Sequence, residues 1–210
     1  AEVAALWGLP SVPAERGKSA VQMFEAAADG EIQALWIACT NPAQSLPDQA
    51  TVRRALQRAE FVVLQEAYTT TATAAYADVL LPATSWGEKS GTVTNSERCI
   101  SRVRAAVAAP GLARDDWAIA AGVAQRIEKL MPPTRVAALQ GESMFRYASP
   151  EDVWNEHRES TRGRDLDITG MSYALLDQAS QQWPLREGET IGAKRLYADG
   201  RFPTPDGRAC

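Results

Sequence analysis

Two short polar segments carry the residues best suited to bind a ligand. Thr40-Asn41-Pro42 follows the apolar run 34–39, and Gln65-Glu66 follows the apolar run 61–64. Their hydroxyl, amide and carboxylate groups could form hydrogen bonds with a nucleotide. The same residue types are also ordinary turn and helix-capping residues, so the spacing alone leaves both interpretations open.

Other residues that could take part in binding or catalysis are weaker candidates. Gly17-Lys18-Ser19 looks like the end of a phosphate-binding loop, but Val12 stands where the first glycine is required, so we interpret Ser19 as a helix N-cap. The single histidine, His157, cannot support a Ser-His-Asp arrangement by itself and is expected to be exposed. Asp115 or Asp116 could act as an acid or base, but helix capping is the preferred interpretation. The sequence predicts no catalytic residue.

Composition and cysteine spacing exclude several classes of protein. The net charge is −4, and no basic cluster indicates a nucleic-acid partner. No stretch approaches the roughly 20 apolar residues that span a bilayer, so no membrane partner is expected. Cys39, Cys99 and Cys210 have no metal-ligand spacing and are expected to be free thiols. The chain is therefore predicted to be cytoplasmic, with no metal ligand of its own.

The elements that position the polar segments form an alternating pattern. Apolar runs at 34–39, 61–64 and 78–81 are separated by segments with helical spacing, which predicts an α/β fold with a parallel, Rossmann-like sheet flanked by helices. Since the runs are continuously apolar, we expect both faces of the sheet to be buried. The carboxyl ends of parallel strands share one edge, where ligands commonly bind.

Capping residues mark the expected helices. Gly30 is expected to stop the helix that starts near residue 20, and Pro132-Pro133 the helix that starts near residue 116. The residues expected at helix starts are Ser19, Asp48, Asp115 or Asp116, and Ser149 before Pro150.

The remaining segments are expected to be irregular. We predict a loop from the start to Lys18, a loop and hairpin over 84–98, and a turn-rich region past Trp183. Two glycine turns around Arg201-Phe202 indicate a hairpin or the approach to another sheet.

Three motifs resemble one family in their order and spacing. Residues 36–47, 77–82 and 88–98 resemble the molybdopterin oxidoreductases, as does Ala113-Arg114-Asp115-Asp116-Trp117. Residues 146–150 and 197–208 resemble the assimilatory nitrate reductase branch. Cys39 and Cys99 depart from the pattern, which usually has glycine and arginine there. The resemblance covers nearly the whole chain and implies an internal fragment of a catalytic subunit.

The resemblance also implies a cofactor, molybdenum held by two molybdopterin guanine dinucleotides. Residues 1–145 would form the domain that binds one dinucleotide, and 146–210 a helical extension toward a missing C-terminal domain. A carboxylate can pair with the guanine edge, and an ammonium group suits pyrophosphate. The residues implied in cofactor contact are Thr40, Asn41, Gln65, Glu66, Lys89 and Asp116.

In the family, an electron pair passes from an iron–sulfur cluster through molybdenum to nitrate, giving nitrite. The cluster cysteines and the molybdenum ligand would lie upstream of this chain, so the isolated fragment is predicted to be inactive. Its expected partners are the remaining domains of the enzyme, an electron donor protein or domain, and nitrate. Two alternatives stay open: a fragment of a formate dehydrogenase or another nitrate reductase branch, and a stand-alone nucleotide-binding or scaffolding module.

Overall fold

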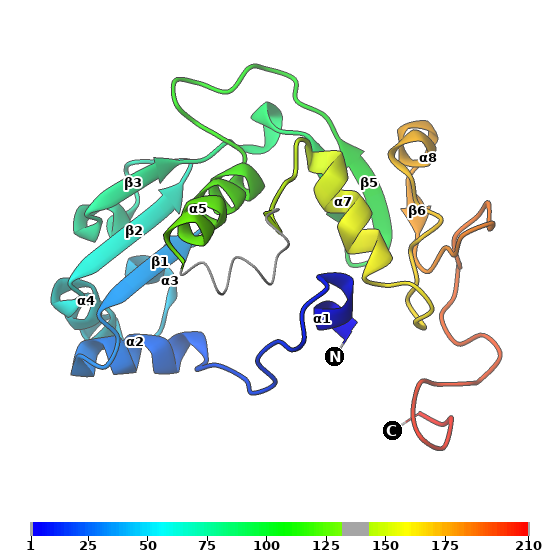
Figure 1. The fold of residues 1–210 in the computed structure, drawn as a ribbon, viewed down its shortest axis with the longest axis horizontal. Coiled ribbons are helices and arrows are strands. Elements are labelled where there is room, and N and C mark those ends of the chain that lie inside the picture. The colour runs from blue at the N-terminus through cyan, green and yellow to red at the C-terminus, as the bar shows by residue number, and fades with distance from the viewer. Residues whose placement is uncertain (1, 132–142, 210) are drawn as a thin grey trace. The chain divides into compact units, whose positions relative to one another are not determined.

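The computed structural model describes residues 2–131 and 143–209 and divides the chain into two compact units (Figure 1). The parallel-sheet unit contains residues 13–88 and 106–131. The antiparallel-sheet unit contains the described residues of 1–12, 89–105 and 132–210. The proposed domain boundary at residue 145 stays a prediction.

The parallel sheet confirms the predicted α/β fold class. Its strands are β1 (Ala34–Ala38), β2 (Phe61–Glu66) and β3 (Val79–Pro82), in the order β1-β2-β3. All pairs are parallel, with Ile37 opposite Leu64 and Leu64 opposite Leu80. The carboxyl ends of the strands therefore lie along one edge, followed by the polar segments singled out in the sequence.

Two helices cover one face of this sheet, α2 (Ala20–Asp29) and α4 (Gln49–Arg58). Ser19 caps α2 in a capping box with Gln22, and Asp48 caps α4 by accepting from the Thr51 N–H, as predicted. Each fully buried valine, leucine or isoleucine side chain in the shared core contributes about 1.5–3 kcal/mol. This core contains Phe24, Ala27, Ala28, Leu35, Ile37, Ala43, Val52, Ala55, Leu56, Val62 and Leu64.

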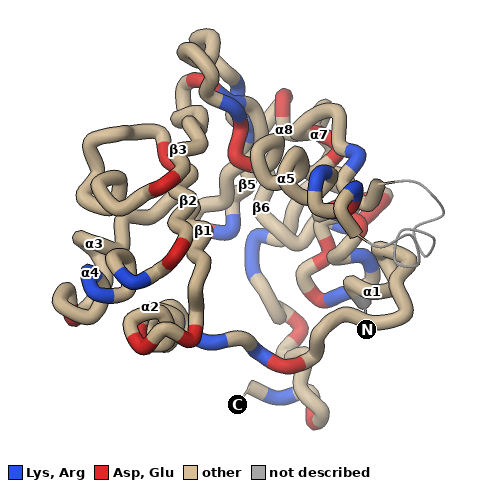
Figure 2. The backbone as a smooth tube through the Cα atoms, turned by 60° about the vertical axis from the view of Figure 1, so that its left-hand side comes forward, with Lys and Arg blue, Asp and Glu red and all other residues tan. Residues whose placement is uncertain are grey.

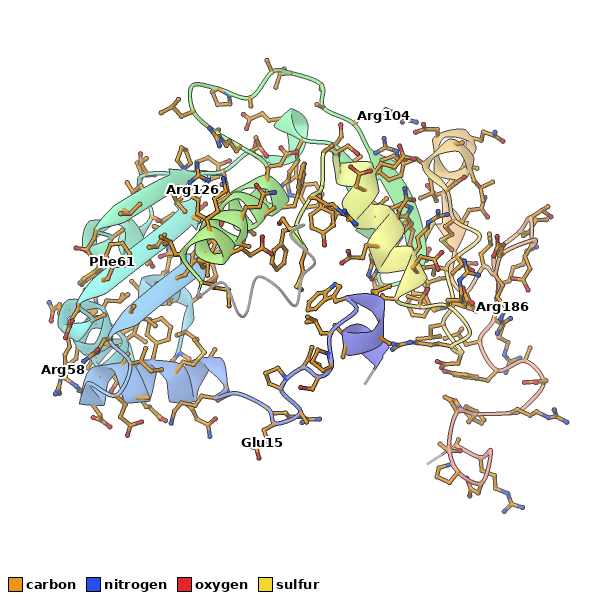
Figure 3. The ribbon with its side chains drawn as sticks, in the orientation of Figure 1. Glu15, Arg58, Phe61, Arg104, Arg126 and Arg186 are labelled. Atoms are coloured by element: carbon orange, nitrogen blue, oxygen red, sulfur yellow. The ribbon has the colours of Figure 1, made fainter. Side chains whose placement is uncertain are left out.

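Arg58 joins the ends of these two helices (Figure 3). Its Nη1 donates to the carbonyl of Ala28 at 3.1 Å. Gly30, the predicted stop of α2, has φ 83°, and a Cβ there would lie 2.6 Å from the Arg58 guanidinium. Gly30 is therefore favoured by its left-handed backbone, and a Cβ there would also displace the Arg58 guanidinium.

The opposite face of the sheet contradicts the prediction of burial on both sides. Trp36 is 44% exposed, Phe61 45% and Val79 36%. The helix on this side, α5 (Asp116–Leu130), lies across the sheet in Figure 1 but is buried mainly at Ile119 and Ala121. A single helix covers less area than the two on the other face, so the apolar residues of the strands stay partly open. The Pro132-Pro133 pair expected to end α5 lies outside the described residues.

Short elements complete the parallel-sheet unit. They are α3 (Pro42–Ser45) and the 3₁₀ turns η1 (Ala72–Tyr76) and η2 (Trp86–Glu88). Figure 2 shows basic residues along α4, and Arg53, Arg54 and Arg58 are exposed. Val52, Ala55 and Leu56 face the core instead, which is the amphipathic pattern that the sequence predicts.

The antiparallel-sheet unit is built around the predicted hairpin. Strands β4 (Gly91–Thr94), β5 (Cys99–Val103) and β6 (Gln181–Gln182) pair in that order. Helix α7 (Pro150–Glu159) begins at a Ser149–Asp152 capping box, which confirms the predicted start, and α8 (Tyr173–Gln178) follows. The core of the unit consists of Ile100, Trp154, Ile168, Met171, Tyr173, Leu176 and Leu185.

One prediction for the irregular segments is wrong, and one of the two alternatives given for the C-terminal region, the hairpin, does not form. The opening residues form helix α1 (Glu2–Leu6) rather than a loop, because alanine and leucine favour helix even where caps are lacking. Around Arg201-Phe202, no strand forms within the described chain, which ends at residue 209. The turn at Gly207 forms, with the Phe202 N–H donating to the Gly207 carbonyl at 3.0 Å.

Arg98, at the turn of the β4–β5 hairpin, holds this C-terminal region. It has φ 66° and donates to the carbonyls of Trp183, Ala193 and Lys194. Three main-chain acceptors far along the chain therefore depend on one guanidinium.

Among the helices that the structure describes, none has the length and apolar character needed to cross a membrane.

Candidate functional site

The side chains of Gln65, Asp116 and Cys39 meet at the carboxyl ends of β1 and β2. Gln65 is the fifth residue of β2, Cys39 directly follows β1, and Asp116 begins α5. The Gln65 Nε2 donates to Asp116 Oδ1 at 2.8 Å, and the Cys39 thiol donates to the same oxygen at 3.2 Å. We call these three residues the carboxylate cluster. Two strand ends thus supply donors to one carboxylate.

The backbone around the cluster is ordered by the sheet. The Cys39 N–H donates to the carbonyl of Gln65 at 3.1 Å, which extends the β1–β2 pairing by one residue. Cys39 itself has φ 57°, a left-handed conformation that favours glycine. The turn therefore adopts this conformation at some cost, and the thiol beyond it contacts Asp116.

The start of α5 is attached to the end of β3 by a second aspartate. Asp115 Oδ1 accepts from the Thr84 hydroxyl at 2.8 Å, and Oδ2 accepts from the Trp117 indole at 3.3 Å. The backbone of Thr84 donates to the carbonyl of Arg114 at 3.0 Å. Asp115 occupies the N-cap position, but its side chain does not cap the helix, because both oxygens are used in these contacts.

The side chain of Asn41, a predicted cofactor contact, is used within the fold. Its Oδ1 accepts from the backbone N–H of Thr73 at 3.0 Å and from the Thr73 hydroxyl at 2.7 Å, and its Nδ2 donates to Gln44 at 2.8 Å. Thr73 is completely buried, and its hydroxyl accepts from the Ala43 N–H at 3.1 Å. Asn41 thus joins the turn after β1 to η1. Thr40, just before it, is exposed.

A small cavity lies where β2 and β3 end. Its volume is about 200 Å³, and the Tyr68 ring at its rim is 64% exposed. Glu66 does not line it, since its carboxylate accepts from the next backbone N–H, that of Ala67, at 2.7 Å. The sequence pointed to Gln65 and Glu66 but missed Tyr68, although it lies two residues beyond them. The cavity is lined by Ala67, Tyr68, Pro82, Ala83, Ser85, Glu88, Pro110 and Ala113.

The sixth predicted contact, Lys89, belongs to the antiparallel-sheet unit and is half-buried. The structure brings Gln65 and Asp116 together and places Thr40, Asn41 and Glu66 at the same edge of the parallel sheet. Membership of Lys89 in one site with these residues stays a prediction.

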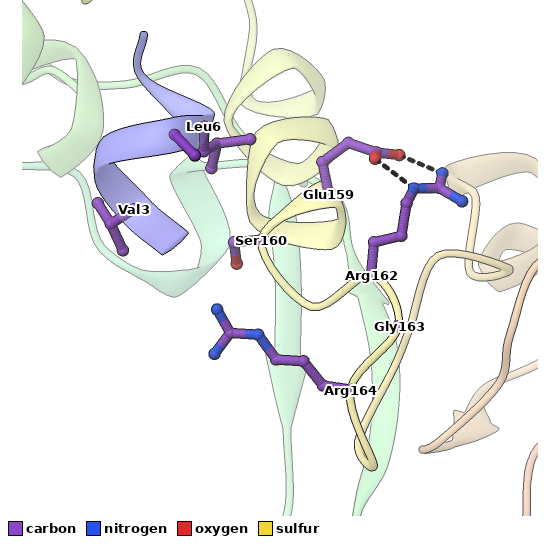
Figure 4. A pocket seen from close by; sticks show the side chains of 8 residues that line it. Val3, Leu6, Glu159, Ser160, Arg162, Gly163 and Arg164 are labelled. Atoms are coloured by element: carbon purple, nitrogen blue, oxygen red, sulfur yellow. Dashed lines mark hydrogen bonds and ion pairs between the residues drawn. The ribbon is translucent and has the colours of Figure 1, made fainter. Parts of the chain in front are cut away.

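A larger hollow, of about 380 Å³, lies within the antiparallel-sheet unit between α1 and the end of α7 (Figure 4). Arg162 on its rim pairs with Glu159 and Glu187, both at 2.7 Å, and these hydrogen bonds raise the pKa of Arg162 above its ordinary value. The charges near the hollow are therefore largely satisfied by each other. Its lining residues are Val3, Ala5, Leu6, Glu159, Ser160, Arg162, Gly163 and Arg164.

No group of three or more His, Cys, Asp or Glu side chains suited to hold a metal ion occurs among the residues that the structure describes. Among the described residues, Cys39 and Cys99 are not in disulfides, as predicted, and Cys210 lies outside the described residues. His157 is exposed, as predicted, with its ring 5.8 Å from that of Trp154.

Comparison with known proteins finds one matching family model and several proteins of similar sequence. The family model for molybdopterin oxidoreductase matches residues 1–126. A nitrate reductase of Synechocystis is 39% identical over 99% of the chain, and the assimilatory nitrate reductase catalytic subunit of Bacillus subtilis is 37% identical over the whole chain. The alpha subunit of an F420-dependent formate dehydrogenase of Methanocaldococcus jannaschii is 36% identical over 84% of the chain.

The chain spans only 28% of the length of the two nitrate reductases and 24% of the formate dehydrogenase subunit. Among solved structures, acetylene hydratase from Pelobacter acetylenicus matches with a TM-score of 0.57 over 84% of this chain and 23% of that one. The sequence identity is 18%, so this match supports the fold alone.

Proposed function

The chain belongs to the molybdopterin oxidoreductase family, and from this premise we propose that it is the part of a molybdenum-dependent nitrate reductase that holds the nucleotide end of the cofactor. The observation that supports this best is the carboxylate cluster, because it places a fixed acceptor at the carboxyl edge of a parallel sheet. The similarity to nitrate reductases over nearly the whole chain supports the choice of substrate.

The cofactor that we propose is molybdenum bis(molybdopterin guanine dinucleotide). The cluster fits its guanine end, because the carboxylate of Asp116 can accept from both N1–H and N2–H of the base. The bound cofactor would supply the two-electron chemistry that reduces nitrate. An iron–sulfur cluster belongs, in this proposal, to a part of the enzyme outside this chain.

The other residues are proposed to contact the nucleotide as well. Thr40 and Asn41 face the nucleotide through the turn after β1, where exposed hydroxyl and backbone groups lie beside the strand end. Glu66 continues the same edge after β2. Lys89 supplies an ammonium group to the pyrophosphate. All of these residues bind and orient the cofactor, and none is proposed to react with substrate.

The whole enzyme is proposed to convert nitrate, two electrons and two protons into nitrite and water. The electrons come from a donor protein or domain, and the remaining domains of the longer chain supply the cluster and the reaction chamber. We propose a cytoplasmic location for the enzyme. The 210-residue chain alone is expected to be inactive.

Calorimetry with GDP tests the binding role. The parent chain is expected to bind GDP. Asp116→Ala and Lys89→Ala are expected to bind it about tenfold more weakly, because each loses one charge-assisted contact. Asp29→Ala, an exposed aspartate at the end of α2, is the matched control and should bind like the parent. Equal affinities for all four proteins would refute the site.

A formate dehydrogenase-type enzyme is the second candidate. It is supported by the formate dehydrogenase relative, which is nearly as similar as the nitrate reductases but over less of the chain. The full-length enzyme, assayed with nitrate and with formate under matched donor and acceptor dyes, separates the two. A coding sequence that starts and stops with this chain would instead favour a stand-alone nucleotide-binding module.

A further inference from the structure

The face of the parallel sheet that α5 covers only in part carries an inference about how this chain fits into a longer protein. We propose that this face binds an apolar helix from a part of the same polypeptide outside these 210 residues, so that the sheet is covered on both sides in the full-length enzyme. The inference rests on the proposed function, since the helix belongs to the remaining domains of the proposed nitrate reductase. It concerns a different surface from the nucleotide site.

Apolar side chains form a continuous row across all three strands on this face. Trp36 on β1 pairs with Val63 on β2, and Val63 pairs with Val79 on β3. Residues paired in this way point to the same side of a sheet. Ala34 and Phe61 form the neighbouring pair on that side, two residues before Trp36 and Val63. We call these five residues the open face.

The open face lies opposite the core of the unit. Leu35 on β1 and Val62 on β2 alternate with its members along the strands, and both are buried in the core with α2 and α4. Trp36 and Phe61 are 44% and 45% exposed (Figure 3 labels Phe61). A sheet that has one face in water normally carries polar side chains on that face. The open face instead carries side chains that are typical of an interior.

Helix α5 is packed at its start and exposed at its end. Gln65 on β2 is buried and bonds to Asp116, the first residue of the helix. Ile119, one turn further along, is buried as well. Leu130 lies about three turns after Ile119 on the same stripe of the helix, yet it is 85% exposed, and Ile127 is also exposed. The last turns of α5 therefore add apolar side chains that are available to a further element.

A helix from the same polypeptide is the occupant that these observations favour. Parallel sheets with continuously apolar strands are covered by helices on both faces, and an exposed apolar patch marks an interaction surface. The chain spans only 28% of the length of its nitrate reductase relatives, so a polypeptide of their length has ample chain to supply the helix. A segment joined covalently also has a much higher effective concentration than a second copy of the chain.

Hydroxyl-radical footprinting tests this by comparing the full-length enzyme with the 210-residue chain. Exposed tryptophan and phenylalanine react readily with the radical. We expect Trp36 and Phe61 to be oxidised roughly fivefold or more slowly in the full-length enzyme, because the core of an interface is packed like a protein interior. Met23 is the matched control, since it is similarly exposed but lies on α2, which covers the opposite face. Its oxidation rate should be nearly the same in both proteins.

The oxidation rates separate this proposal from its alternatives. Equal rates for Trp36 and Phe61 in the two proteins would overturn the inference, and GDP binding by the same enzyme would leave the proposed function intact. Protection that disappears when the full-length enzyme is diluted would assign the open face to a second copy and would also overturn the inference. Protection that persists without GDP binding would support the interface and refute the nucleotide site.

Phe61→Glu gives a second measurement. The substitution places a charge in a dry interface in the full-length enzyme but on an exposed surface in the 210-residue chain. The soluble yield should therefore fall roughly fivefold or more for the full-length enzyme and less than about twofold for the chain. Val21→Glu on α2, where Val21 is similarly exposed, is the control and should change neither yield. An equal loss at both lengths, or no loss at either, would contradict the interface.

Discussion

Replacing Thr73 with valine should destabilise the parallel-sheet unit, although the two side chains have nearly the same shape. The Thr73 hydroxyl is completely buried, donates to Asn41 Oδ1 at 2.7 Å and accepts from the Ala43 N–H at 3.1 Å. Valine can make neither hydrogen bond. The substitution therefore weakens the link between η1 and the turn after β1 without creating a cavity, and leaves only the hydrogen bond from the Thr73 N–H to Asn41 Oδ1 at 3.0 Å.

The size of the effect follows from the two lost bonds. The Ala43 N–H is left buried without its acceptor, which costs about 1–3 kcal/mol, and the lost bond to Asn41 adds about 1 kcal/mol. The added methyl group returns somewhat less than 1 kcal/mol through burial. We expect a net loss of roughly 2–3 kcal/mol in the free energy of unfolding.

Urea denaturation combined with amide hydrogen exchange measures this loss. Exchange at β1 and β2 reports the parallel-sheet unit separately from the other unit, and the Ala43 amide should lose most of its protection. Thr70→Val, an exposed threonine in the same segment, is the control and should change stability by less than about 0.5 kcal/mol. If the two variants unfold at the same urea concentration and Ala43 stays protected, the hydrogen-bond assignment is wrong.

Two further predictions concern the antiparallel-sheet unit. Burial alone would raise the pKa of Asp167, but hydrogen bonds, chiefly those from Thr169, outweigh it and hold the pKa below its ordinary value. The carboxylate therefore contributes stability above the unfolded pKa of about 3.9, and this stability is lost as pH falls through the lower folded pKa. The difference in urea midpoint between the parent and Asp167→Asn should therefore become smaller toward acid pH. A difference that stays constant with pH would contradict this. In Gly170→Ala the new Cβ would lie 2.1 Å from Leu185, so thermal denaturation should show a loss of roughly 3 kcal/mol or more, against almost none for Gly17→Ala, where nothing lies within 4 Å.

Much of the fold was predictable because its signals are local. Ser19, Asp48 and Ser149 cap helices whose first backbone N–H groups lie three residues away, so the pattern is complete within one turn. The three apolar runs likewise identify the parallel strands. Predictions failed where the outcome depends on what covers a surface, as on the open face of the sheet around Trp36 and Phe61.

The site was predictable only in part. The sequence indicated the segments after β1 and β2, and the family resemblance added Asp116. It did not reveal that Asn41 would bond to Thr73, 32 residues away, or that Gln65 and Cys39 would share one oxygen of Asp116. Tyr68 was missed because an exposed tyrosine in a loop has no periodicity to distinguish it.

Residue types and their spacing alone determined the helix starts, the strand positions and the edge of the sheet at which the polar segments lie. Tertiary structure decided which polar groups at that edge are used to hold the fold and which side chains it brings together there. The physical reason is that caps and periodicities involve neighbours within four residues, whereas the hydrogen bond from Gln65 to Asp116 spans 51 residues and exists only once β2 and α5 are packed together.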